Sequence, residues 1–181
     1  RGAATALLTP FRPDGSIDLP AWDRLLERQL DAGIAALVVC GTTGEAATLT
    51  QDERLTLLRR AKQAACGHCP VIMGVGTNCT AGSVENAELA AQNGADALLA
   101  VTPYYNKGTQ AGLLAHYTAI ADASSCRRRC GRSPAIRILQ ASRKPAAASA
   151  GQHSCWAGAV YRFGAATTTR QPRSWRSAAA A

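Results

Sequence analysis

The 181-residue chain has few aromatic residues, a single methionine and no uncharged apolar run long enough to cross a bilayer. A transmembrane helix needs about 18 or more consecutive apolar residues, so the sequence predicts no membrane span. The N-terminus also lacks the apolar stretch and small-residue cleavage site of a signal peptide. These absences favour a cytoplasmic chain without a membrane partner.

Neither a GxGxxG sequence nor a Walker-type phosphate loop occurs, which argues against the common nucleotide folds, and we expect no cofactor. The seven cysteines do not indicate a disulfide framework in a chain without a secretion signal. Cys66 and Cys69 have the spacing of a redox motif, but they follow a helix pattern and precede a strand pattern. That order is the reverse of thioredoxin-like proteins. We therefore expect neither a redox centre nor a metal site.

Acidic residues are missing from the last third of the chain. All twelve lie before residue 124 with nine of the twenty basic residues, so residues 1–123 carry a net charge of −3. Residues 124–181 contain the other eleven basic residues and no acid, which gives this part a net charge of +11. They contain only four of the thirty Leu, Ile and Val residues. The overall charge of +8 describes neither part. The composition therefore divides the chain into residues 1–123 and 124–181.

Residues 1–123 alternate strand patterns with helix patterns. Apolar runs predict strands at residues 3–9, 34–40, 71–75 and 95–101. The continuous apolar run 34–40 is typical of a strand buried on both faces. Asp18 and Pro20 are expected to begin the first helix, and Gly33 follows its end. Its apolar face is predicted to contain Trp22, Leu25, Leu26 and Leu30.

Three more helices follow the later strand patterns. Thr50 and Glu53 form a capping box ahead of the second helix. Its apolar stripe is predicted to contain Leu55, Leu58, Ala61 and Ala65. Thr80 is expected to cap a third helix with an apolar side made of Val84, Ala87 and Ala91. A fourth helix is expected at residues 110–121.

Four successive strand–helix units predict a parallel sheet with helices outside it, which both an open doubly wound sheet and a closed barrel satisfy. Glycines and hydroxyl residues follow each strand, where the active sites of (β/α)₈ barrels are built. We therefore predict the N-terminal half of a (β/α)₈ TIM barrel, an α/β fold. A whole barrel takes about 250 residues, and four units alone would leave two open strand edges.

The sequence Gly-Thr-Thr-Gly-Glu at residues 41–45 follows the second strand. Backbone N–H groups, two hydroxyls and small side chains suit the binding of a carboxylate. An ordinary turn with capping threonines fits the same residues. Tyr104 and Tyr105 after the fourth strand can likewise be aromatic packing under a loop.

Four segments in order resemble motifs of the dihydrodipicolinate synthase family. They are ALLTPFRPDGSID (6–18), GTTGEAATLTQDE (41–53), MGVGTN (73–78) and VTPYYNKG (101–108). The resemblance implies a lyase that condenses pyruvate, held as a Schiff base, with aspartate semialdehyde in diaminopimelate and lysine biosynthesis. It also implies a homotetramer or homodimer.

The resemblance further assigns roles to three residues of this chain. Thr43 matches the residue that holds the pyruvate carboxylate, and Thr42 matches the first hydroxyl of a proton relay. Tyr105 matches the relay tyrosine that a partner subunit supplies. Two alternatives remain: another pyruvate-dependent aldolase, such as an N-acetylneuraminate lyase-like or keto-deoxy-sugar aldolase, or a non-catalytic half barrel that pairs with a partner protein.

The family's later motifs, a YNVPxRTG-like segment and a GxKE-like segment with the Schiff-base lysine, do not occur. Lys62 is expected on a solvated helix face. Lys107 lies on a loop at the catalytic end but does not match the family nucleophile, and Lys144 lies in the basic tail. We therefore expect the chain as written to be inactive and poorly soluble or partly folded.

Residues 124–181 are rich in Arg, Ala, Ser and Pro. An out-of-frame translation of GC-rich DNA gives this composition, and a genuine disordered tail has a similar one. A nucleic-acid-binding arm would interleave basic and aromatic residues or form a recognisable module, whereas the aromatics here are scattered. We favour the out-of-frame origin, with no structure of its own and no nucleic-acid partner.

Overall fold

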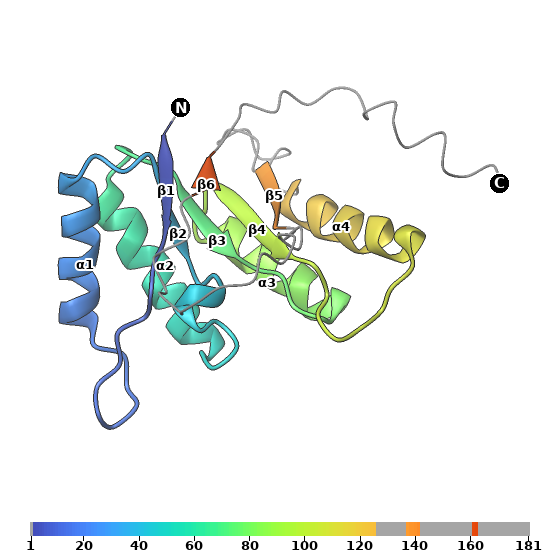
Figure 1. Ribbon diagram of the computed structural model, residues 1–181, viewed down its shortest axis with the longest axis horizontal. Helices are drawn as coiled ribbons and strands as arrows, with labels where there is room; N and C mark the ends of the chain where they lie inside the picture. The colour runs from blue at the N-terminus through green and yellow to red at the C-terminus, as the bar shows by residue number, and fades with distance from the viewer. Residues whose placement is uncertain (1, 126–136, 142–160, 163–181) are drawn as a thin grey trace, which may run out of the picture.

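The computed structural model describes residues 2–125, 137–141 and 161–162. Strands and helices alternate along residues 2–125, and the helices cover one face of a single sheet (Figure 1). The elements are β1 (Ala3–Ala6), α1 (Leu19–Asp31), β2 (Ala36–Val39), the 3₁₀ helix η1 (Thr42–Gly44), α2 (Gln51–Ala65), β3 (Val71–Gly74), α3 (Thr80–Gln92), β4 (Ala97–Val101) and α4 (Gln110–Ser125). The four predicted strand–helix units are confirmed, with strands shorter than their apolar runs.

The strands β1 to β4 pair in parallel and in chain order. Ala4 pairs with Ala36, Val38 with Ile72, and Met73 with Leu98. Each crossover passes through a helix, as parallel strands require. The helices lie on the same face of the sheet because the strands follow chain order and such crossovers are right-handed. All the loops that follow strands therefore open at one edge of the sheet.

Two segments of the basic tail also belong to the sheet, which corrects our expectation of a tail without structure. β5 (Arg137–Ala141) pairs in parallel with β4, and β6 (Tyr161–Arg162) pairs antiparallel with β1. The predicted open edges of β1 and β4 are therefore paired. An exposed strand edge presents backbone donors and acceptors that any extended segment can use, whatever its side chains. Residues 124 and 125 end α4, and residues 126–136, 142–160 and 163–181 lie outside the described ranges.

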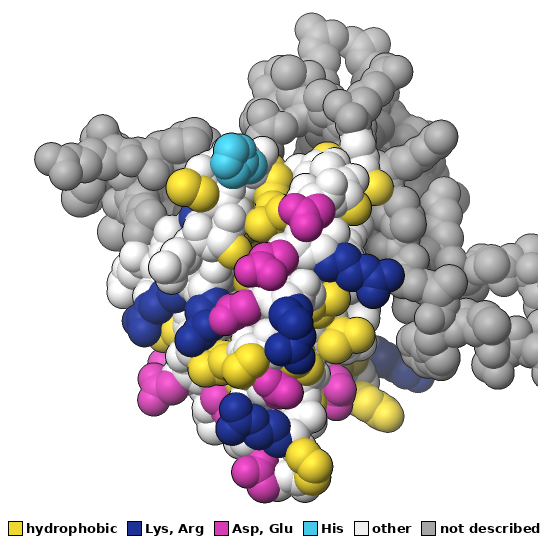
Figure 2. All heavy atoms as spheres, turned by 90° about the vertical axis from the view of Figure 1, so that its left-hand side faces the viewer, with side chains coloured by type: hydrophobic (Ala, Val, Ile, Leu, Met, Phe, Trp, Pro, Cys, Tyr) yellow, Lys and Arg dark blue, Asp and Glu magenta, His cyan; other side chains and the backbone are white. Residues whose placement is uncertain are grey.

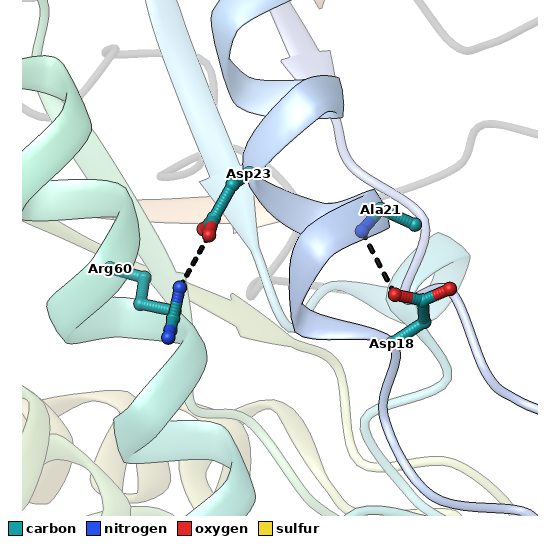
Figure 3. A network of polar contacts seen from close by, with 4 residues as sticks. All are labelled: Asp18, Ala21, Asp23 and Arg60. Carbon is teal, nitrogen blue, oxygen red and sulfur yellow. Dashed lines mark hydrogen bonds and ion pairs between the residues drawn. The ribbon is translucent and has the colours of Figure 1, made fainter.

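The first helix begins and ends as predicted. The Asp18 carboxylate accepts a hydrogen bond from the backbone N–H of Ala21 at 3.0 Å, and this bond caps α1 (Figure 3). Trp22 and Leu26 are buried, while the other predicted apolar residues pack partly buried against the same core. Gly33 follows the helix with φ +69°, a conformation that costs glycine little.

The second helix has the predicted capping box, since Thr50 and Glu53 exchange side chain–backbone hydrogen bonds. Its buried stripe differs by one residue: Leu57, rather than Leu55, is buried with Leu58. An ion pair between Arg60 of α2 and Asp23 of α1 joins the two helices on their outer side (Figure 3). Both side chains are partly exposed, so this pair contributes little to stability.

The predicted cap of the third helix is wrong. Thr80 is the first helical residue of α3, and Cys79 occupies the cap position without a side-chain hydrogen bond. The Thr80 hydroxyl instead lies 2.8 Å from Nδ1 of His116 on α4. A contact between two helices thus uses the hydroxyl that the local pattern assigned to capping.

The strands β2 and β3 are buried on both faces, as their apolar runs predicted, while β1 and β4 are buried in part. One face packs against the helices and contributes residues such as Leu37, Met73 and Leu98 to the main core. The opposite face forms a second, smaller cluster made of Ala4, Ala36, Val38, Ile72 and Ala97. In a closed barrel this second face points to the interior. The alternation of the two clusters along each strand follows the two-residue period of a β-strand.

The outer side of the molecule carries charges of both signs. Figure 2 shows Lys and Arg side chains interspersed with Asp and Glu over the face on the α1 side. No helix in the described part of the chain is long and apolar enough to span a membrane. The helices therefore present the mixed polar surface that is typical of the outside of an α/β fold.

Gly74 should tolerate no larger residue, because a Cβ there would lie 2.0 Å from the carbonyl oxygen of Cys40. We expect Gly74→Ala to lower the free energy of unfolding by about 3 kcal/mol or more, since one strand backbone would have to move. Gly82→Ala in α3 is the matched control, because a Cβ there would lie 3.7 Å from its nearest neighbour, the hydroxyl of Thr77. The control should be neutral or stabilising by about 0.5 kcal/mol. Urea unfolding followed by circular dichroism compares them, and equal midpoints would contradict the close contact.

Candidate active-site edge

The loops after β1 to β4 gather hydroxyl and amide side chains at the carboxyl edge of the sheet. Thr9 follows β1, the 41–45 turn follows β2, residues 76–78 follow β3, and residues 102–106 follow β4. These segments are far apart in sequence and share this edge because the strands are parallel. The predicted position of these hydroxyl- and glycine-containing loops at the carboxyl ends of the strands is confirmed for the described residues, and their part in a binding site stays a prediction.

The 41–45 turn is compact and tied to the sheet. Cys40 leaves β2 with φ +53°, and Glu45 ends η1 with φ +53°. Inside the turn, the N–H of Gly44 donates to the carbonyl of Gly41 at 3.0 Å. The Thr9 hydroxyl donates to the buried carbonyl of Gly44 at 2.8 Å. The turn is therefore fixed from β1 as well as from β2.

Thr42 and Thr43 both lie on the exposed side of this turn. They are the first two residues of η1, whose N–H groups have no acceptor within the helix. Within residues 2–125, neither their N–H groups nor their hydroxyls have a hydrogen-bond partner. The turn thus presents two backbone donors and two hydroxyls to an approaching anion.

Tyr105 projects from the loop after β4. Its φ is +63°, a conformation that residues other than glycine rarely adopt, and its side chain is 99% exposed. Tyr104 beside it is 45% exposed. Asn106 holds the loop by donating from Nδ2 to the carbonyl of Asn78 at 2.8 Å. Tyr105 therefore extends away from the surface that surrounds it rather than packing under the loop.

The structure places Thr42 and Tyr105 on the same edge but does not bring their hydroxyls together. Neither hydroxyl makes a hydrogen bond to any residue in the described ranges. The tyrosine hydroxyl of Tyr117, by contrast, donates to Thr102 at 3.0 Å inside the same chain. The predicted relay is therefore not formed within one copy of the described chain.

The described lysines lie at opposite edges of the sheet. Lys62 is ion-paired at 2.6 Å with Asp96, which precedes β4 and also accepts the N–H of Val71 at the start of β3. Our placement of Lys62 on a solvated face is therefore wrong, because the pair holds it at the amino edge. Lys107 is exposed on the loop after β4. Lys144 lies outside the described residues.

Four described cysteines are reduced, and they differ in burial. Cys40 and Cys69 are buried, while Cys66 and Cys79 are exposed. Burial raises the pKa of the Cys40 thiol to about 11, and the neighbouring Arg54 partly offsets that effect. No group of three or more His, Cys, Asp or Glu side chains suited to a metal occurs in the ranges that the structure describes.

The sequence reading missed Arg54, a half-buried arginine on the inner side of α2. It donates to the carbonyl of Gly74 at 2.7 Å and to the side chain of Asn86 at 3.0 Å. Its position one residue after the capping-box Glu53 gave the only signal. A charged residue near the start of a helix is ordinarily solvated, so the sequence around Arg54 did not distinguish it from a surface arginine.

Comparisons with known proteins agree with this architecture. The model of the Dihydrodipicolinate synthetase family matches residues 1–127. A 4-hydroxy-tetrahydrodipicolinate synthase from Exiguobacterium sibiricum is 56% identical over 123 residues, which are 68% of this chain and 42% of that protein. The chain therefore spans about two-fifths of the length of the curated relatives it matches.

Solved structures show the same fold. The dihydrodipicolinate synthase of Thermotoga maritima is 41% identical with a TM-score of 0.68, and the match covers 77% of this chain and 44% of that one. The chloride-inhibited enzyme of Acinetobacter baumannii complexed with pyruvate is 34% identical with a TM-score of 0.69, over 78% and 56% of the two chains. These similarities confirm the predicted half barrel.

The burial of Cys40 predicts a large difference in thiol reactivity. With a pKa of about 11, only about one thiol in a thousand is ionised at pH 8, and the thiolate is the reactive form. We expect iodoacetamide at pH 8 to label exposed Cys66 at least about a hundredfold faster than Cys40, as followed by mass spectrometry of peptides. Labelling of Cys40 should increase as the pH rises toward 11. Equal rates at pH 8 would show that Cys40 is accessible and ionised.

Proposed function

We propose, because this chain belongs to the dihydrodipicolinate synthetase family, that residues 1–123 are the pyruvate-binding half of a 4-hydroxy-tetrahydrodipicolinate synthase. The complete enzyme would condense pyruvate with aspartate semialdehyde in the biosynthesis of diaminopimelate and lysine. The observation that carries the proposal is the 41–45 turn, whose unpaired donors lie at the carboxyl edge. The synthase names of the relatives support this reading over other pyruvate-dependent aldolases.

Thr43 is our candidate for binding the pyruvate carboxylate. Its N–H and hydroxyl are both without partners among the described residues, and its side chain is exposed. Hydrogen bonds from neutral donors to an anion are about twice as strong as those to a neutral acceptor. A carboxylate held here would place the adjacent carbonyl carbon of pyruvate above the sheet edge, within the opening of the barrel.

The covalent step of this chemistry needs a lysine amine. The amine attacks the pyruvate carbonyl and water leaves, and the resulting protonated imine makes the methyl group acidic enough to lose a proton. The enamine carbon then attacks the aldehyde carbonyl. Lys62 lies at the amino edge of the sheet, away from the candidate site, and Lys107 does not match the family nucleophile. We therefore propose that the described half supplies binding and proton transfer, not the nucleophile.

Thr42 and Tyr105 are our candidates for proton transfer. Hydroxyl groups at hydrogen-bond distance can pass a proton without leaving a charge buried in the site. The 99% exposure of Tyr105 supports a role in which its hydroxyl enters the site of a second copy. We therefore propose a dimer or tetramer as the active assembly, with the relay completed across a subunit interface.

We propose that residues 124–181 are translated out of frame. The family match ends at residue 127, and the tail carries eleven basic residues without an acid. Sequencing the coding DNA across codons 115–135 should show that another frame resumes with an arginine motif and a GxKE-like lysine segment. If no frame does so, the tail is genuine and the 181-residue chain should not form a pyruvate imine.

The site assignment can be tested in a whole barrel. Residues 1–123 fused to the remaining segment of the Exiguobacterium sibiricum synthase should give an active enzyme, because the two halves come from one family. Thr43→Ala should raise the KM for pyruvate by about tenfold or more, the loss expected for a hydrogen bond to a charged group. Thr56→Ala on α2 is the control and should leave KM unchanged.

Tyr105→Phe in the same fusion should lower kcat by about a hundredfold, since it removes only the hydroxyl of the proposed relay. Tyr104→Phe removes the same group from the neighbouring residue and should change kcat by less than about threefold. If both variants lose activity equally, Tyr105 has no special part in proton transfer. An inactive fusion with a folded, tetrameric or dimeric barrel would count against the synthase proposal itself.

A further inference from the structure

Arg54 joins three elements, α2, β3 and α3. From α2, its Nη2 donates to the carbonyl of Gly74 at the end of β3, at 2.7 Å. Its Nη1 donates to Oδ1 of Asn86 on α3, at 3.0 Å. The side chain is partly buried, and the described residues offer its Nε no hydrogen-bond partner. The guanidinium is therefore held by two directed contacts and not by an exposed carboxylate.

Asn86 extends this contact along β3. Its Nδ2 donates to the carbonyl of Val75 at 3.2 Å, while its Oδ1 accepts from Arg54. The carbonyls of two successive residues, Gly74 and Val75, are thus bound by side chains from α2 and α3. Carbonyls at the end of a strand otherwise need water or a loop. The pair of side chains therefore fixes the exit of β3.

The exit of β2 lies against the exit of β3 at the same point. A Cβ on Gly74 would lie 2.0 Å from the carbonyl oxygen of Cys40 and 3.1 Å from the nitrogen of Gly41. Cys40 has the left-handed φ of +53° that turns the chain into the 41–45 turn. Burial raises the pKa of its thiol, and a hydrogen bond and the charge of Arg54 act in the opposite direction. Arg54 thus contacts both the kinked residue and the strand behind it.

We propose that Arg54 is a positioning residue that fixes the 41–45 turn, so that the donors of Thr42 and Thr43 are aimed at the substrate. Its importance for pyruvate rests on the proposed function, whereas its importance for the turn does not. The guanidinium donates to its two acceptors from two separate nitrogens of a rigid plane, whereas the donors of a lysine all lie on one nitrogen at the end of a flexible chain. The geometry therefore suits arginine better than lysine at this position.

Hydrogen exchange of the complete 181-residue chain tests the effect on the turn. In Arg54→Met, the peptide that contains residues 40–45 should exchange about tenfold faster or more relative to peptides of α3. Arg54→Lys keeps the charge and should give a smaller increase in the exchange rate of this peptide. If Arg54→Met is poorly soluble, the Arg54→Lys variant alone tests whether Arg54 fixes the turn. Arg59→Met is the matched control, because Arg59 also lies on α2 and its Nε donates at 2.8 Å to the side-chain oxygen of Asn93, the residue that caps the end of α3.

Two results would overturn the proposal: unchanged exchange at residues 40–45 in both Arg54 variants, or an equal increase in Arg59→Met. Pyruvate binding to the same proteins, measured by ligand-observed NMR, tests the link to substrate. Arg54→Met should weaken binding by about tenfold at an unchanged urea midpoint. A loosened turn with unchanged pyruvate affinity would overturn the substrate role of Arg54. Absence of binding by the unmodified chain would count against the proposed function, and hydrogen exchange would still decide whether Arg54 fixes the turn.

Discussion

The parallel pairing of β1 to β4 is the constraint on which the rest of the structure depends. Strands that run in one direction must be joined by crossovers. Because the strands also follow chain order and the crossovers are right-handed, α1, α2 and α3 all cover one face of the sheet. The same direction brings every loop that follows a strand to one edge. Thr9, Thr43 and Tyr105 share that edge although they lie far apart in sequence. A site at this edge is thus a consequence of the fold before any side chain is considered.

The second constraint is the close contact between the exits of β2 and β3. Only glycine at position 74 allows the Cys40 carbonyl to approach so closely, and only then can the chain kink at Cys40. A non-glycine residue with positive φ costs of order 1–3 kcal/mol, so the contacts around it must hold it there. The bond from Thr9 to the carbonyl of Gly44 and the contacts of Arg54 do so. The Thr9 hydroxyl, the close contact of Gly74 with Cys40 and the Arg54 side chain thus all hold the turn.

Much of the fold could be predicted because its signals are local. The cap at Asp18, the capping box at Thr50 and the glycine after α1 each depend on neighbours within four residues. The errors occurred where a distant partner decided the outcome. Thr80 bonds His116 of α4 instead of capping α3, and Lys62 pairs with Asp96 across 34 residues. The strand at Arg137–Ala141 pairs through backbone groups, which leave no trace in side-chain composition.

The candidate site divides in the same way. The residues of the 41–45 turn could be identified from the sequence, since glycines and hydroxyls at a strand end indicate a binding loop. Arg54 could not, because its importance arises only from its contacts with Gly74 on another strand and Asn86 on another helix. A residue that touches a substrate often belongs to a short motif. A residue that holds such a motif in place belongs to the tertiary structure.

The exposure of Tyr105 relates the half barrel to its proposed chemistry. A tyrosine held at φ +63° with its side chain 99% in solvent gains no packing energy within its own chain. Backbone strain of this kind clusters at functional sites, which agrees with the proposed role of Tyr105. The small apolar cluster on the inner face of the sheet agrees with the proposed assembly, because alanines such as Ala4 and Ala97 bury little area by themselves. Both features make sense in an assembly that supplies the rest of a barrel on one side and a second subunit on the other.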